Sequence, residues 1–134
     1  MAFNQILPAK AFPWSPSIKN VAEKGTQNIL DVIPDKCKII MPSTHVVYEG
    51  INHVKKDISE DEKTSPVLSY AKSKDYNEKQ LRNSGKNYII LRLGSVYGYS
   101  QDTMRLDIMP NLFSKITSQN GVLKLFSGGK QIKS

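Results

Sequence analysis

The residues with the clearest chemical potential are a tyrosine and a lysine four positions apart, Tyr70 and Lys74. On an α-helix this spacing brings both side chains to one face, close enough to share a site. A nearby ammonium group favours the phenolate, the form that a tyrosine must reach to exchange protons near neutral pH. With 16 lysines and six tyrosines in the chain, such a pair also arises by chance. The alternative interpretation is a half-buried helix tyrosine beside a solvated lysine.

Two hydroxyl residues, Ser43 and Thr44, follow the apolar run CKIIMP. That run is typical of a buried parallel strand over 37–43. The carboxyl ends of strands line the ligand crevice in open α/β sheets, so a hydroxyl there is placed to work beside Tyr70. Serine and threonine are also common turn residues after a strand, which is the alternative interpretation.

Helical and strand patterns alternate around these residues. The spacing of apolar residues, together with proline and glycine at the boundaries, predicts helices over 17–33, 66–84 and 106–118. Runs rich in branched and aromatic residues predict strands over 37–43, 87–93 and 122–126, and a polar loop covers 44–65. Strands separated by helices of this length predict βαβ units, and therefore the α/β class with a parallel sheet.

Taken together, several strings resemble the NAD-dependent epimerase/dehydratase family of the extended short-chain dehydrogenase/reductases, in particular nucleotide-sugar epimerases. The strings are GTQNIL, PSTHVVYEG, ISEDE, SPVLSYAKSK, NYIILRLGSVYG and LFSGGKQIKS, in the family's order over nearly the whole chain. The resemblance implies a partial Rossmann-like, doubly wound parallel sheet with helices on its faces. It also implies NAD or NADP as cofactor and a nucleotide sugar as substrate.

The same resemblance implies roles for individual residues. Tyr70 is the expected general acid/base, Lys74 its partner on the nicotinamide ribose, and Thr44, with Ser43 beside it, the hydroxyl that orients the sugar. The implied reaction is epimerase-like, as in the interconversion of UDP-glucose and UDP-galactose, by transient hydride transfer to the cofactor. The candidate residues lining the nicotinamide and the substrate are Gly94, Val96 and Ser95, the last standing where many such epimerases have asparagine.

The chain lacks the Gly-rich turn that binds the pyrophosphate of a dinucleotide in this type of fold. None of the eight glycines stands in a G-x-G-x-x-G arrangement after a strand. The resemblance to the family, together with this missing turn, implies that residues 1–134 are a single partial domain: the C-terminal part of a cofactor domain over about 1–100, and the start of a substrate-binding region over about 101–134. We accordingly expect the chain by itself to be inactive, and the resemblance allows a homodimer in a longer form.

Composition and sequence pattern argue against a membrane protein, a secreted protein and a metal-binding protein. Hydrophobic residues make up 39% and charged residues 23%, and no window approaches the roughly 20 apolar residues of a membrane span. The start of the chain lacks the pattern of a signal peptide, and the single cysteine fits a reducing cytosol, so a cytoplasmic protein is expected. The two histidines have no partners at metal-ligand spacing, so no metal is expected.

A net charge of +7 raises the question of a polyanionic partner. The basic residues are scattered, and no glycine-aromatic motif of an RNA-binding sheet occurs, which argues against a nucleic-acid module. The other alternative is a catalytically inactive chain of the same family.

Overall fold

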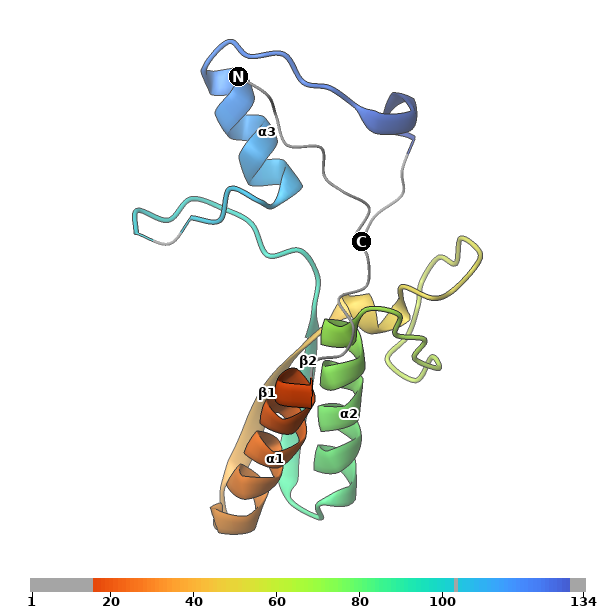
Figure 1. Ribbon diagram of the computed structural model, residues 1–134, viewed down its shortest axis with the longest axis vertical. Helices are drawn as coiled ribbons and strands as arrows, with labels where there is room; N and C mark the ends of the chain where they lie inside the picture. Colours follow the sequence, from red (N-terminus) through yellow and green to blue (C-terminus); the bar gives the residue numbers. More distant parts are fainter. Residues whose placement is uncertain (1–15, 103, 131–134) are drawn as a thin grey trace. The chain divides into compact units, whose positions relative to one another are not determined.

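The computed structural model describes residues 16–102 and 104–130. The chain divides into two compact units, Met1–Leu93 and Gly94–Ser134. The elements in chain order are α1 (Pro16–Val32), β1 (Lys38–Thr44), the 3-10 helix η1 (His45–Tyr48), α2 (Ser69–Asn83), β2 (Asn87–Leu93), α3 (Met109–Ser118) and the 3-10 helix η2 (Phe126–Gly129) (Figure 1).

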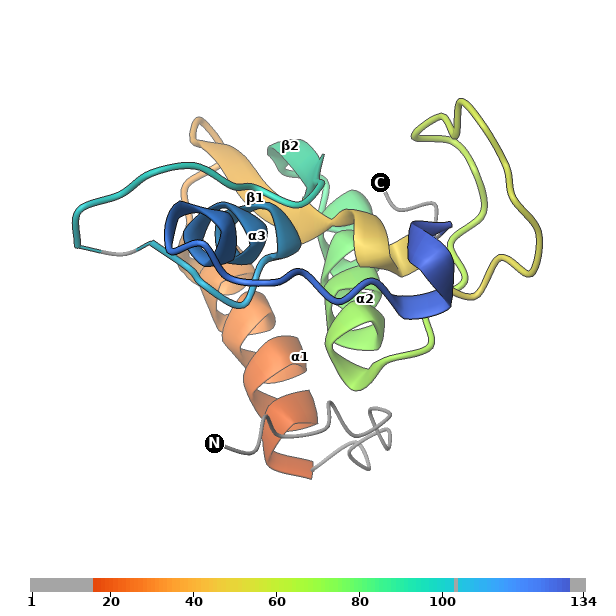
Figure 2. The same ribbon diagram turned by 90° about the horizontal axis from the view of Figure 1, so that it is seen from above.

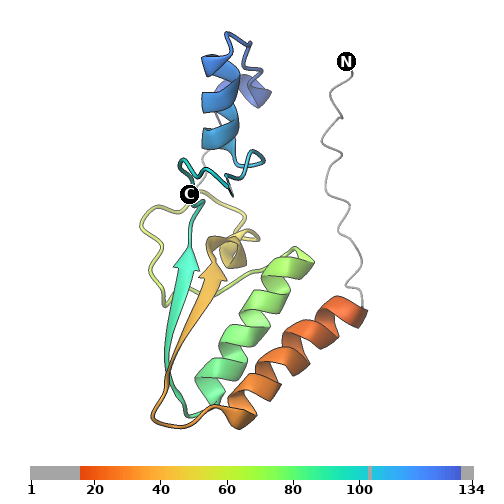
Figure 3. The same cartoon turned by 90° about the vertical axis from the view of Figure 1, so that its left-hand side faces the viewer.

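In the first unit, β1 and β2 form a parallel pair connected through α2. The register runs from Lys38 opposite Asn87 to Thr44 opposite Leu93, so both strands end at the same edge. Helices α1 and α2 lie side by side on one face of the pair (Figure 3). The α/β class with a parallel Rossmann-like sheet is thus confirmed for this part of the chain.

Alternating side chains give the two strands one inner and one outer face. The inner face of β2 includes Arg92, which contacts α2, whereas Ile89 and Leu91 on the outer face are about two-fifths exposed. The apolar core lies between the strands, the two helices and η1. Its buried members among the described residues are Leu30, Val47, Ala71 and Leu81. Gln80 of α2 joins the helices by donating from Nε2 to the Glu23 carbonyl of α1 at 3.0 Å.

Helix α2 begins at Ser69, three residues after the predicted start at position 66. The Glu49 carboxylate accepts hydrogen bonds from the backbone N–H groups of Val67, at 2.8 Å, and Leu68. This carboxylate satisfies donors that precede the first turn and keeps the chain extended at Leu68. A contact from a residue far back in the sequence therefore sets the start of the helix.

The segment 49–65 leaves η1 and returns to α2 as a long loop (Figure 2). Its base is closed by two backbone hydrogen bonds, from Gly50 N–H to the Ser65 carbonyl and from Ser65 N–H to the Val47 carbonyl, both 2.8 Å. A Cβ at position 50 would lie only 2.5 Å from the Ser65 carbonyl oxygen. Glycine is therefore required where the two ends of the loop meet.

The second unit contains α3, which has a proline in its first turn. The side chain of Asn111 is buried, accepts from Gly98 N–H at 3.0 Å and donates to the Arg105 carbonyl at 2.9 Å. The prediction of a third strand over 122–126 is wrong: residues 122–125 lie outside any strand and η2 begins at Phe126. Val122 is 83% exposed, and among the described residues no neighbouring strand offers this segment a hydrogen-bond ladder.

Candidate functional site

Tyr70 and Lys74 occupy the first half of α2 and lie together on one face of it. The Lys74 Nζ lies 5.9 Å from the centroid of the Tyr70 ring, at the outer limit of a cation–π contact. Tyr70 is 55% exposed, so its phenol is accessible to a small molecule. The pair thus offers an accessible hydroxyl with a positive charge beside it.

Lys74 also reaches the neighbouring strand. Its Nζ donates to the Pro42 carbonyl oxygen of β1 at 2.8 Å. Pro42 lies two residues before Thr44, the last residue of β1. One ammonium group therefore connects the tyrosine on the helix to the carboxyl end of the strand.

The two strand-end hydroxyls have different surroundings. Thr44 is 6% exposed, and its Oγ1 accepts the Val46 N–H at 3.3 Å, which caps η1. Its own O–H remains as a donor, because that capping bond uses only a lone pair of the oxygen. Ser43 is also buried, and its hydroxyl donates to the Glu78 carboxylate in the interior.

Glu78 and Arg92 form a buried ion pair that the sequence analysis did not identify. Arg92 Nε lies 3.1 Å from both carboxylate oxygens of Glu78, and Nη2 lies 2.6 Å from Oε2. The two side chains are only 2% and 11% exposed. Hydrogen bonds to the Glu78 carboxylate raise the pKa of Arg92 above its ordinary value. The available signal was a single arginine within the otherwise apolar string YIILRL, because a charge in a buried strand requires a partner.

The guanidinium group of Arg92 continues this network into the loop. Nη1 donates to the hydroxyl of Tyr48 and, at 2.8 Å, to the carbonyl oxygen of Glu60. The guanidinium carbon lies 5.1 Å from the Tyr48 ring centroid, and the Tyr48 hydroxyl donates to the Ser59 carbonyl at 3.2 Å. The acidic string around Glu60 is therefore held by its backbone to the end of the sheet.

His45 joins the two strand ends. Its Nδ1 lies 3.1 Å from the Leu93 carbonyl oxygen of β2. A carbonyl oxygen only accepts hydrogen bonds, so Nδ1 is the donor in this contact. The bond fixes His45 next to Thr44 at the edge where both strands end.

The other predicted site residues, Gly94, Ser95 and Val96, belong to the second unit. Gly94 follows directly on the last residue of β2. Val96 is 66% exposed and Ser95 is half-buried. Ser43, Thr44, Tyr70 and Lys74 thus lie in the first unit. Gly94, Ser95 and Val96 begin the second unit.

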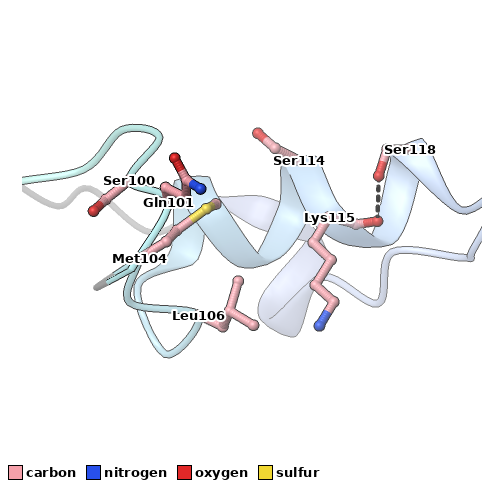
Figure 4. A pocket seen from close by; sticks show the side chains of 7 residues that line it. All are labelled: Ser100, Gln101, Met104, Leu106, Ser114, Lys115 and Ser118. Carbon is pink, nitrogen blue, oxygen red and sulfur yellow. Dashed lines mark hydrogen bonds between the residues drawn. The ribbon is translucent and has the colours of Figure 1, made fainter.

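An open depression of about 540 Å³ lies within the second unit. Met104 and Leu106 contribute apolar surface to it, and Lys115 and Ser118 of α3 contribute polar groups (Figure 4). The Ser118 hydroxyl donates to the Lys115 carbonyl at 2.8 Å within the helix. None of the site residues expected from the sequence lines this depression.

The described residues bear on two further expectations. In this part of the chain, no group of three or more histidine, cysteine, aspartate and glutamate side chains is arranged to hold a metal ion. Across residues 16–102 and 104–130, no helix is long and apolar enough to cross a membrane.

Comparison with known proteins adds one finding. The family model described as the RmlD substrate binding domain matches residues 18–123. No curated protein and no solved structure matches the chain. The matched range includes every site residue discussed above, from Ser43 to Val96.

Proposed function

The chain belongs to the RmlD substrate binding domain family, which comprises sugar-nucleotide-modifying proteins of the short-chain dehydrogenase/reductase type, and on that premise we propose a catalytic role for Tyr70, Lys74 and Thr44. The proposed protein is an NAD(P)-dependent epimerase or dehydratase acting on a nucleotide sugar. This chain contributes the end of the cofactor domain and the start of the substrate-binding region.

The observation that carries the proposal is the double contact of Lys74. Its ammonium group lies beside the Tyr70 ring and donates to the Pro42 carbonyl oxygen. It thereby connects the side of α2 that carries Tyr70 to β1, two residues before Thr44. A half-exposed tyrosine beside a solvated lysine, the alternative interpretation, requires no contact with the sheet.

In the proposed mechanism, Tyr70 exchanges a proton with the sugar hydroxyl at the reacting carbon. The positive charge of Lys74 stabilises the phenolate that accepts this proton. The remaining O–H donor of Thr44 binds the oxygen of the same sugar hydroxyl and orients it. When the carbon is reduced again, Tyr70 returns the proton, so that the enzyme ends the cycle unchanged.

The described residues fit one end of the proposed cofactor. Lys74 has three N–H donors, of which the Pro42 carbonyl takes one, and the others suit ribose hydroxyls. Gly94 and Val96 are proposed to border the nicotinamide, and Ser95 the substrate. NAD or NADP supplies the hydride chemistry that no side chain performs. The pyrophosphate has no comparable seat, because the sequence contains no Gly-rich turn after a strand.

The test compares nucleotide sugars with the corresponding free sugars as substrates. The assay uses this chain joined to a preceding segment that carries a Gly-rich turn, which we call the cofactor segment. This protein is incubated with NAD or NADP and with UDP-hexoses, dTDP-hexoses or the free hexoses. Product is followed by proton NMR and cofactor reduction by absorbance. We expect turnover of a nucleotide sugar and none of the free hexose. Absence of turnover with every nucleotide sugar and both cofactors would contradict the proposal and favour an inactive family member.

A further inference from the structure

We infer that Glu78 and Arg92 are positioning residues, which hold Thr44 and the segment 49–65 in place at the carboxyl end of the sheet. Neither residue is proposed to touch substrate. The inference rests on the proposed function for the identity of the site, but its geometry can be tested without any activity.

Two full charges are buried in this ion pair. The Glu78 carboxylate and the Arg92 guanidinium are almost completely shielded from solvent. A buried ion pair is weak evidence for stability, because apolar residues of similar volume often stabilise a core equally well. In this protein the pair joins groups that apolar side chains would leave unconnected.

The ion pair connects several elements at the carboxyl end of the sheet. The Glu78 carboxylate accepts the hydroxyl of Ser43, the residue before Thr44. Arg92 binds the Tyr48 hydroxyl in η1 and the Glu60 carbonyl in the loop. Two side chains thus link helix α2, both strands, η1 and the segment 49–65.

The shape of the guanidinium group matters for these contacts. One edge, Nε and Nη2, binds the carboxylate, while Nη1 reaches Tyr48 and Glu60. A planar fork can make these contacts at once, whereas the ammonium of a lysine is a single point of charge. Arginine at position 92 is therefore expected to be required where a simple positive charge would not suffice.

The experiment uses hydrogen exchange on the 134-residue chain, which needs neither cofactor nor substrate. The apolar double variant E78L/R92M removes both buried charges of the network together. Arg82, whose Nη2 lies 3.9 Å from the Glu78 carboxylate, is about half exposed and remains in contact with solvent. The milder variant Y48F removes one hydroxyl only, in case the double variant fails to fold. The control is E62Q, which removes the exposed Lys55–Glu62 ion pair in the same loop but leaves Arg92 intact.

We expect amide exchange at Val46, Gly50 and Ser65 to accelerate about tenfold or more in E78L/R92M and to a lesser extent in Y48F. The amides of Leu30 and Leu81, in the helix core, should keep their wild-type rates, as should all five in E62Q. Faster exchange throughout the chain would show a merely structural role, and unchanged exchange at the three site amides would exclude positioning. Either result overturns the inference.

Turnover is measured on the same variants, and on R92K in addition, in the protein carrying the cofactor segment. We expect kcat to fall about tenfold in R92K, with KM for the nucleotide sugar nearly unchanged, because a displaced Thr44 affects the reacting geometry. Wild-type kcat in R92K would contradict the requirement for arginine. If the wild type itself turns over no nucleotide sugar, the proposed function fails, while hydrogen exchange still decides the positioning role.

Discussion

Replacing Tyr70 by phenylalanine should separate catalysis from stability in this site. The substitution removes a single oxygen from a side chain that is 55% exposed. The ring beside Lys74 remains, so that the contact between the ammonium group and the aromatic face is kept. Surface substitutions of this kind usually change the free energy of unfolding by no more than about 0.5 kcal/mol.

The expected effect on catalysis is far larger. Removing a general acid/base costs about 10² to 10⁴ in rate. At about 1.36 kcal/mol for each tenfold change, the lower figure corresponds to roughly 2.7 kcal/mol of transition-state stabilisation. We therefore expect kcat of Tyr70→Phe to fall at least about 100-fold, at unchanged stability.

The matched control is Tyr76→Phe, because Tyr76 lies on the same helix and is 41% exposed. Turnover of the nucleotide sugar is measured for wild type and both variants in the protein that carries the cofactor segment, and urea unfolding is followed by circular dichroism. Near-normal turnover by Tyr70→Phe would refute the acid/base assignment. An equal loss in Tyr76→Phe would show that the assay reports a general effect of the helix.

Three further outcomes are expected. Lys74→Met should lower kcat and raise the KM for the nicotinamide cofactor. The loss of the hydrogen bond to the Pro42 carbonyl should lower the free energy of unfolding by only about 1 kcal/mol. An unchanged KM for the cofactor would show that Lys74 is not part of the cofactor site. Hydrogen bonding to Lys86 lowers the pKa of Asp35 in the folded chain. The ion pair therefore stabilises the fold above the pKa that Asp35 has in the unfolded chain, and this stabilisation is lost as pH falls through its folded-state pKa. The urea midpoints of wild type and Asp35→Asn should converge as pH falls through this range, and a difference that persists at lower pH would contradict the link between the Asp35 pKa and stability. Calorimetric titration of the 134-residue chain with NAD or NADP should show no micromolar binding, since the chain has no Gly-rich turn for the pyrophosphate, and micromolar binding would refute that reasoning.

The local elements of the first unit could be predicted from the sequence because their signals are local. The strand 87–93 is found with its predicted bounds, since a continuous run of branched and aromatic residues has no competing pattern. Gly85, with φ at 70°, stands just after α2 and marks the end of that helix, as expected for a left-handed residue. The spacing of Tyr70 and Lys74 likewise needs only a helix to bring the two together.

What the sequence did not reveal depends on distant partners. The apolar string at 122–126 resembles a strand, but a strand forms only where another strand completes its hydrogen bonds, and Val122 remains exposed. Glu49 sets the start of α2 across 18 residues of chain, a contact that no local pattern encodes. Glu78 looks like an ordinary solvated residue of a polar helix until Arg92 is seen facing it from β2.

The helix α2 carries Tyr70, Lys74 and Glu78 at successive intervals of four residues, so all three project along one side of it. Exposure falls along this row, from 55% at Tyr70 to 2% at Glu78. Rotating the helix by one residue, about 100°, would carry the whole row away from the strands. The buried ion pair of Glu78 with Arg92 opposes that rotation at the inner end, and the bond from Lys74 to the Pro42 carbonyl opposes it in the middle. We therefore expect the orientation of the exposed phenol to depend on a buried ion pair two turns away. On the proposed function, the anchoring residues and Tyr70 then act as one site.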